Sequence, residues 1–317
     1  MSVTRNTDIR AYPASGTAPL ETQAAEDTHR FRVADYAVIL KPRVMSLVVF
    51  TACVGLVLAP GSIAPLTALI AIACIAAGAG ASGAINMWYD QDIDRIMLRT
   101  MTRPIPAGRM RPIEALVTGT TLGSFAVGVM ALFVNAAAAL LLALTILYYV
   151  FIYTVWLKRR TPQNIVIGGA SGALPPMIGW AAVTGDIGLG AMALFAIIFL
   201  WTPPHSWALA LYRNADYAAA GVPMMPVVAG AETTKRLMLV YTALLLPATL
   251  APVMIGMSGW LYGATAIALG IVFAGHTIRL ARDPGIGPAR PMFLYSILYL
   301  FLIFVALLAD RAFATLI

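Results

Sequence analysis

Three acidic residues and an asparagine lie close together in the segment Asn86-Met-Trp-Tyr-Asp90-Gln-Asp92-Ile-Asp94. Asn86, Asp90 and Asp94 are spaced four residues apart, so on a helix of 3.6 residues per turn they share one narrow stripe. Asp92 falls on the other side. Carboxylates one turn apart repel each other unless a cation lies between them, and oxygen ligands suit Mg²⁺, which also takes water and substrate phosphate. The stripe therefore predicts a magnesium site.

Basic residues follow the acidic stripe within a few positions. Arg95, Arg99 and Arg103 lie immediately downstream, and a guanidinium can bind a phosphate through two parallel hydrogen bonds. Lys158 opens a run of three basic residues further along the chain. That run is either a signal of membrane orientation or a source of one more phosphate ligand, and Lys158 is the preferred ligand. Carboxylates that bind Mg²⁺ beside cations that bind phosphate indicate a diphosphate site.

The alternative for the same residues is a solvated helix end with i, i+4 ion pairs. The surrounding sequence argues against it. Of 317 residues, 60% are hydrophobic and 11% are charged, whereas soluble domains carry about 25% charged residues. In a membrane protein, a carboxylate at the end of a span usually lines a cavity or binds a ligand. The functional interpretation of Asn86, Asp90 and Asp94 is therefore favoured.

Nine apolar segments are long enough to cross the hydrocarbon core of a membrane, which is about 30 Å thick. The sequence predicts an all-α, polytopic membrane protein, with a bundle of nine transmembrane helices in residues 36–317 and a disordered cytoplasmic tail in residues 1–35. Twenty of the 21 lysines and arginines fall on one side of this arrangement, so the N-terminus is expected in the cytoplasm and the C-terminus on the opposite side. The net charge of +7 reflects this orientation, and no nucleic-acid binding is expected. The predicted spans are residues 37–59, 63–88, 112–133, 136–157, 165–184, 188–211, 236–257, 259–280 and 292–313.

A second polar segment, Tyr212-Arg-Asn214-Ala-Asp216, follows the sixth predicted span. Asn86 and Asp216 each mark the end of an even-numbered span, so topology alone places both acidic segments at the same membrane face. Two acidic helix ends and the basic loops are therefore expected to face the same compartment.

His205 lies within the sixth span, in Trp201-Thr-Pro203-Pro204-His205-Ser-Trp207. About three helical turns separate it from Asp216, a depth that suits a second substrate. The double proline is expected to interrupt the helix and make room for a large ligand. At this depth a histidine can ligate a metal, bond to a carboxylate or act as a base. It can equally be a neutral core residue bonded to a carbonyl that the prolines free, and both interpretations stay open.

Nine spans with Asn86-x3-Asp90-x3-Asp94 and a second acidic segment resemble the UbiA-type intramembrane prenyltransferases. Longer motifs are similar to the haem-farnesylating branch of that family, and the resemblance runs from about Lys41 to the end of the chain. The motifs are Asp94-x2-Met97-x-Arg99-Thr100-x2-Arg103-Pro104, Tyr153-Thr154-x3-Lys158-Arg159-x-Thr161, Pro175-Pro176-x2-Gly179-Trp180, Trp201-x-Pro203-Pro204-His205 and Asp216-Tyr217-x3-Gly221-Val222-Pro223-Met224.

The resemblance implies transfer of a farnesyl group from farnesyl diphosphate to a vinyl group of haem b, with addition of water, giving haem O and diphosphate. It implies Mg²⁺ as the cofactor, held by Asn86, Asp90, Asp94 and Asp216, with the three acids as the catalytic residues. Many relatives carry two carboxylates four apart in the second motif, but Tyr212 stands at the earlier place here, so Asp216 is the one carboxylate at these two places. The residues assigned to substrate binding are Asn86, Arg99, Arg103, Lys158, His205 and Tyr212.

Two other functions fit parts of the pattern. A prenyltransferase for an aromatic quinone precursor shares the diphosphate site but needs neither His205 nor a cavity of porphyrin size. An ion-coupled transporter also places carboxylates in the membrane, yet usually near the midplane and in paired repeats. The expected partners are farnesyl diphosphate, haem b and membrane lipid, with association with a downstream haem-modifying enzyme or the terminal oxidase assembly machinery. The expected location is the bacterial inner membrane.

Overall fold

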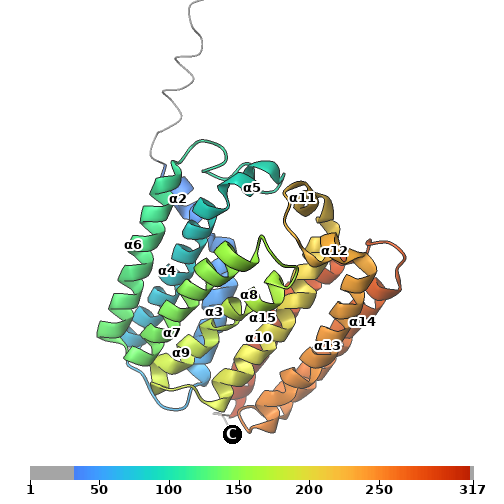
Figure 1. Ribbon diagram of the computed structural model, residues 1–317. Helices are drawn as coiled ribbons and strands as arrows, with labels where there is room; N and C mark the ends of the chain where they lie inside the picture. Colours follow the sequence, from blue (N-terminus) through green and yellow to red (C-terminus); the bar gives the residue numbers. More distant parts are fainter. Residues whose placement is uncertain (1–31, 315–317) are drawn as a thin grey trace, which may run out of the picture.

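In a computed structural model that describes residues 32–314, the chain forms a bundle of long helices that run side by side (Figure 1). The predicted disordered tail, residues 1–35, lies almost wholly outside the described residues and stays a prediction there. Its last three residues, 33–35, are not a disordered tail, because they form the start of a helix. The helices are α2 (Val33–Ile39), α3 (Pro42–Leu58), α4 (Pro65–Tyr89), α5 (Gln91–Ile96), α6 (Pro112–Phe133), α7 (Ala136–Leu147), the π-helix η2 (Tyr148–Leu157), α8 (Asn164–Ala173), α9 (Pro175–Thr184), α10 (Leu189–Tyr212), α11 (Asn214–Ala219), α12 (Met225–Val228), α13 (Gly230–Met254), α14 (Trp260–Arg282) and α15 (Ala289–Ala314).

Within residues 32–314, eight helical stretches are long and apolar enough to cross a membrane. The stretch Ala136–Leu157 joins α7 to η2, and Asn164–Thr184 joins α8 to α9. The helices α2 and α3, bent by 54° at a short break, make a ninth span when they are counted together. The predicted all-α bundle of nine spans is confirmed on that count, and the chain is a multi-pass integral membrane protein.

Prolines start several helices and lie inside two others, α10 and α13. Because proline lacks an N–H and has a fixed φ, it fits the first helical position. Pro203 and Pro204, by contrast, lie inside α10, which continues to Tyr212. The prediction that they interrupt the helix is wrong. Both prolines are buried, and neighbouring helices can hold such a helix together across the missing hydrogen bonds. The helices that begin with proline in the first turn include those starting at Pro42, Pro65, Pro112 and Pro175.

The backbones of α3 and α9 are in direct contact where the two helices cross. A Cβ atom added at Gly179 would lie 2.1 Å from the carbonyl oxygen of Ala52, and one added at Gly55 would lie 2.1 Å from that of Pro176. Only glycine fits at both positions, because any side chain would push the two backbones apart. This crossing joins α3 to α9, the helix that begins at the double proline Pro175-Pro176.

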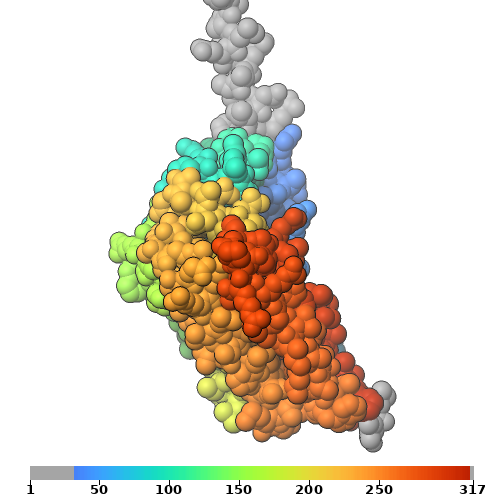
Figure 2. All heavy atoms as spheres, turned by 90° about the vertical axis from the view of Figure 1, so that its right-hand side faces the viewer, coloured from blue at the N-terminus to red at the C-terminus, as the bar shows by residue number. Residues whose placement is uncertain are grey.

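The two acidic segments lie at the same end of the bundle. Figure 1 shows α5 and α11 on either side of this end, and Figure 2 shows the same end from a perpendicular direction. Ile93 of α5 is buried in one apolar cluster with Ala210 of α10 and with Val222 and Met224, which follow α11. The cluster therefore holds the segment of Asp90 and Asp94 beside the segment of Asp216.

We expect Gly179→Ala to lower the thermal stability of the purified protein, because the added methyl group overpacks a backbone contact, at a cost of about 1–3 kcal/mol. The matched control is Gly172→Ala, where an added Cβ meets nothing within 4 Å. Melting curves of both variants in the same detergent provide the measurement. Equal melting temperatures for the two variants would contradict the close crossing of α3 and α9.

Candidate active site

The acidic stripe keeps its helical register across the junction of α4 and α5. The N–H of Asp90 donates to the Asn86 carbonyl, and the N–H of Asp94 donates to the Asp90 carbonyl, both at 2.9 Å. The side chains of Asp90 and Asp94 are only 1% and 3% exposed, whereas that of Asp92 is 58% exposed. The stripe therefore faces the protein interior and Asp92 points away, as the helical period predicts.

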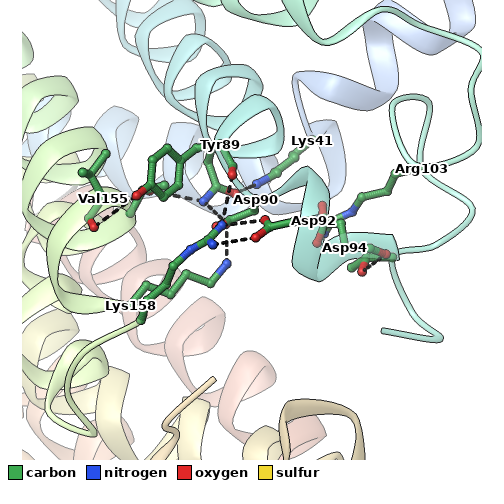
Figure 3. Close-up of polar contacts among 12 residues, drawn as sticks. Lys41, Tyr89, Asp90, Asp92, Asp94, Arg103, Val155 and Lys158 are labelled. Atoms are coloured by element: carbon green, nitrogen blue, oxygen red, sulfur yellow. Dashed lines mark hydrogen bonds and ion pairs between the residues drawn. The ribbon is translucent and has the colours of Figure 1, made fainter. Parts of the chain in front are cut away.

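Asp90 lies at the centre of a network of polar contacts that joins α4 to the end of η2 (Figure 3). Its Oδ2 accepts a hydrogen bond from Asn86 Nδ2 at 2.6 Å and another from the ammonium group of Lys158. Its Oδ1 is buried without a hydrogen-bond partner, 3.6 Å from Nη2 of Arg159. One oxygen is thus paired with a cation, and the other keeps its lone pairs for a ligand.

Asp94 is paired in the same way with an arginine that the sequence assigns to phosphate. Arg103 Nη1 donates to Asp94 Oδ2 at 2.6 Å, and the hydroxyl of the buried Thr100 donates to the Asp94 carbonyl at 3.0 Å. Because a buried carboxylate is costly without a counter-charge, each acid of the stripe needs the basic residue beside it. The cations and carboxylates of the predicted site therefore form one charge-balanced group.

Lys41 belongs to this group, although sequence reasoning treated it only as a charge that marks membrane orientation. It lies at the break between α2 and α3, and its Nζ donates to Asn86 Oδ1 at 2.7 Å. Among the described residues it is the only one other than glycine with a positive φ, at 54°. Such a backbone persists only where its surroundings hold it, often at functional sites. The signal in the sequence was a lysine directly before the proline that opens a span.

Arg159 is a second residue that sequence reasoning missed. Its two terminal nitrogens donate to the two carboxylate oxygens of Asp92 at 2.7 Å each, and Nη2 also donates to the Tyr89 carbonyl at 3.0 Å. The hydrogen bond from Arg159 holds the pKa of Asp92 below its usual value, and the same bond raises the pKa of Arg159. Arg159 therefore clamps the end of α4 to α5 and fixes the turn that presents Asp90.

Asp216 contributes a carboxylate from the second acidic segment. Its Oδ2 is buried without a hydrogen bond and lies 3.8 Å from Nη1 of Arg213. Burial raises the pKa of the neighbouring Tyr217, and the positive charge of the Arg99 guanidinium, which also hydrogen-bonds to it, opposes that shift. Arg99, which is otherwise exposed, thus reaches from the first motif towards the second.

Tyr212 has a different environment from the acids. Its ring packs edge-on against Phe293, with 5.9 Å between the ring centroids, and the Arg213 guanidinium lies 5.5 Å from its centroid. It belongs to the partly buried surface of the apolar core rather than to the charged group.

The oxygen atoms at this end suit Mg²⁺ without forming a complete cage. Among residues 32–314, no three His, Cys, Asp or Glu side chains are grouped closely enough to hold a metal ion by themselves. Mg²⁺ usually takes one or two carboxylates and fills its shell with water and substrate phosphate. The free, buried oxygens of Asp90 and Asp216 fit that requirement.

His205 lies within α10 and is held between two aromatic rings. Its ring stacks on Trp201 at 4.2 Å and on Phe293 at 4.8 Å, and its Nδ1 is 2.7 Å from the hydroxyl of Ser296. Because α10 ends at Tyr212, the predicted distance of three turns to Asp216 along one helix does not apply; His205 is about two turns, roughly 10 Å, before the helix end.

The indole of Trp201, which stacks on His205, also donates its N–H to the Ser296 carbonyl at 2.7 Å. Trp201 and Ser296 thus fix the histidine ring in place.

Comparison with known proteins agrees with this geometry. Residues 48–309 match the model of the UbiA prenyltransferase family. The fold is similar to that of a digeranylgeranylglyceryl phosphate synthase, with a TM-score of 0.74 and 17% identity over 88% of this chain and 98% of the other. It is also similar to a UbiA homologue from Archaeoglobus fulgidus solved with GPP and Mg²⁺, with a TM-score of 0.59 and 16% identity over 86% and 99% of the two chains. The chain belongs to the UbiA prenyltransferase family and is a prenyltransferase.

Relatives with higher sequence identity identify the branch of the family. A protein from Sinorhizobium fredii named protoheme IX farnesyltransferase is 58% identical over 87% of this chain and 88% of its own length. A protein of the same name from Agrobacterium fabrum is 58% identical over 87% and 89%. Within the family, the chain belongs with the protohaem IX farnesyltransferases, which confirms the branch that the sequence motifs indicate.

We expect Asp90→Asn and Asp94→Asn each to lower the rate of prenyl transfer by about a hundredfold or more, because each removes a buried charge from the group that faces the diphosphate. Asp92→Asn should cost far less, since Asp92 acts only through Arg159. Initial rates of the three purified variants test this order. The order would be contradicted if Asp92→Asn were as slow as Asp90→Asn while both variants elute and melt like the parent protein.

Proposed function

We propose that the enzyme transfers a farnesyl group from farnesyl diphosphate to a vinyl group of haem b, with addition of water, and releases haem O and diphosphate. The observation that carries the proposal is the buried group in which Asp90 and Asp94 face Lys158 and Arg103 at one end of an apolar bundle. The names of the 58% identical relatives support farnesyl and haem as the substrates.

The basic side chains of the group would bind the diphosphate. Lys158 and Arg103 now neutralise Asp90 and Asp94, and each can exchange a carboxylate oxygen for a phosphate oxygen without crossing the site. Arg99, on the exposed loop, can close over the phosphate from the side of Tyr217. Asp90, Asp94 and Asp216, with the oxygen of Asn86, are the proposed ligands of Mg²⁺. Because the acids of residues 32–314 are not grouped closely enough to hold a metal by themselves, water and the diphosphate would complete its shell. When bound, Mg²⁺ neutralises the charge of the departing diphosphate.

The apolar bundle below this group would hold the farnesyl chain. Loss of diphosphate breaks the C–O bond and leaves an allylic cation, which aromatic faces stabilise and a dry environment protects from water. The rings of Tyr149 and Tyr153 on η2 contact each other near the polar group, with 5.3 Å between centroids and a tilt of 41°. A Cβ at Gly168 would lie 2.2 Å from the Tyr153 ring. Because Gly168 has no side chain, α8 can pack directly against the Tyr153 ring and fix its position.

The second substrate, haem b, would react through its vinyl group. Its electron pair forms the new C–C bond to the farnesyl carbon, the resulting cation takes a water molecule, and the proton of that water leaves to solvent. This order needs the haem edge beside the allylic carbon while water is held back until the C–C bond has formed.

Mass spectrometry of porphyrins after incubation of the purified enzyme with haem b, farnesyl diphosphate and Mg²⁺ tests the proposal. We expect haem b to gain one farnesyl group and one hydroxyl group. Addition of the prenyl group to an aromatic quinone precursor, with haem b unchanged, would replace the proposal by the alternative acceptor. Omission of Mg²⁺ should abolish either product.

His205 is proposed to contact the haem. Its Nδ1 is engaged with Ser296, and its Nε2 makes no hydrogen bond among the described residues. An imidazole oriented by a hydrogen bond at one nitrogen is ready to ligate a metal through the other. The rings of Trp201 and Phe293 cover its two faces, so any ligand must approach at its edge.

We expect His205→Ala to weaken haem b binding about tenfold or more and to change the visible spectrum of the bound haem, with farnesyl diphosphate affinity unaltered. Ser296→Ala provides the matched partner variant, because it frees the ring without removing it, and should give a smaller change in the same direction. An unchanged spectrum and haem affinity in His205→Ala would assign His205 to the core instead.

Membrane sidedness is part of the proposal as well. The excess of basic residues at the end that carries the site supports a cytoplasmic position for this end and for the N-terminus, in the bacterial inner membrane. Association with a downstream haem-modifying enzyme or with the terminal oxidase assembly machinery stays a prediction from the resemblance.

A further inference from the structure

We propose that Asp35 is a positioning residue for the prenyl diphosphate, acting through Arg109 on the loop of residues 97–111. The inference rests on the proposed function, because it takes Arg99 and Arg103 of this loop as diphosphate ligands. Asp35 lies in α2, and the loop lies between α5 and α6. The loop contains no long helix of its own, so contacts with other elements must determine where its arginines lie.

An unbroken series of contacts runs from Asp35 to the acidic stripe. Both carboxylate oxygens of Asp35 accept from Nε of Arg109, at 3.1 and 3.3 Å. Nη2 of Arg109 donates to the carbonyl of Thr102 at 3.2 Å. Thr102 precedes Arg103, whose guanidinium donates to Asp94 at 2.6 Å. The carboxylate of one helix thus fixes the backbone next to an arginine that faces the metal-binding acids of another.

Burial makes this pair more than a surface ion pair. The side chain of Asp35 is 9% exposed and that of Arg109 is 34% exposed. A carboxylate with so little access to water depends on its counter-charge, whereas exposed pairs contribute little. Arg109 in turn needs Asp35 to hold its fork towards the Thr102 carbonyl.

The two halves of the loop differ in how they are held. Ile105 and Met110 are buried in one apolar cluster with Ile39 of α2. The first half is held at fewer points: Met97 and Thr100 are buried, but Leu98 is 71% exposed and Arg99 is exposed as well. The Asp35–Arg109 pair therefore joins the packed half to the half that carries the phosphate ligands.

The same short helix also carries Lys41 just beyond its end, with its ammonium on Asn86. A shift of α2 would move both Lys41 and the loop, so α2 couples two sides of the diphosphate site. The bend of 54° between α2 and α3 shows that α2 follows its own direction rather than that of the span. Its position depends on these polar contacts and on the cluster around Ile39.

Limited trypsin digestion of the full-length enzyme tests the proposal, with mass spectrometry of the fragment that ends at Arg99. Asp35→Asn keeps the side-chain shape but removes the charge, so we expect cleavage after Arg99 to become about tenfold faster. The concentration of farnesyl diphosphate, with Mg²⁺, that halves this cleavage should rise about tenfold. Arg109→Gln should give both changes, and the double variant should add little to either, because the two residues form one contact.

Asp186→Asn is the matched control, an exposed aspartate between α9 and α10 at the other end of the bundle, and should leave both readouts unchanged. Unchanged cleavage in an Asp35→Asn variant that melts like the parent would overturn the proposal. So would faster cleavage without any change in protection by farnesyl diphosphate. Because digestion involves no acceptor, failure of haem b to react appears separately, in the porphyrin assay of the parent enzyme.

Discussion

Buried carboxylates paired with cations from other segments are the interaction on which the site depends. Asp90 and Asp94 have almost no access to water, and each is held by a basic residue, Lys158 and Arg103 respectively. An unpaired carboxylate in such a place costs several kcal/mol, so the acids cannot face the interior unless the cations come with them. The pairing therefore requires the end of η2 and the loop after α5 to lie against the end of α4.

The apolar bundle makes this arrangement rigid. Helices in a membrane associate through close packing rather than through the hydrophobic effect, so small residues at crossings determine how near they come. Gly55 and Gly179 bring the backbones of α3 and α9 into direct contact, and Gly168 lets α8 approach Tyr153. Support from neighbouring helices likewise lets α10 continue through the buried Pro203 and Pro204.

The cations of this group also prepare the site for an anion. Lys41, Lys158 and Arg103 reach the group of Asn86, Asp90 and Asp94 from three different segments. A diphosphate with its metal ion can enter such a group by exchange of partners, with no net charge left unpaired in a poorly solvated place. The clamp between Arg159 and Asp92 and the tie between Asp35 and Arg109 hold the backbone from which these groups project.

The sequence by itself determined the features that depend on short-range periodicity and on length. The thickness of the hydrocarbon core sets the length of a span, so the bundle of nine spans could be predicted from the lengths of the apolar segments. The helical period placed Asn86, Asp90 and Asp94 on one face and Asp92 on the other. Long local motifs were sufficient to indicate the family.

Only the tertiary structure decided which distant residues meet. Lys41 is 45 positions from Asn86, Arg159 is 67 from Asp92, and Arg109 is 74 from Asp35. No local pattern encodes these contacts, because they follow from how whole helices pack and from where a turn directs a side chain. The continuity of α10 could not be predicted from the sequence for the same reason. Local propensity opposes proline inside a helix, and the support that outweighs it comes from neighbouring helices remote in the sequence.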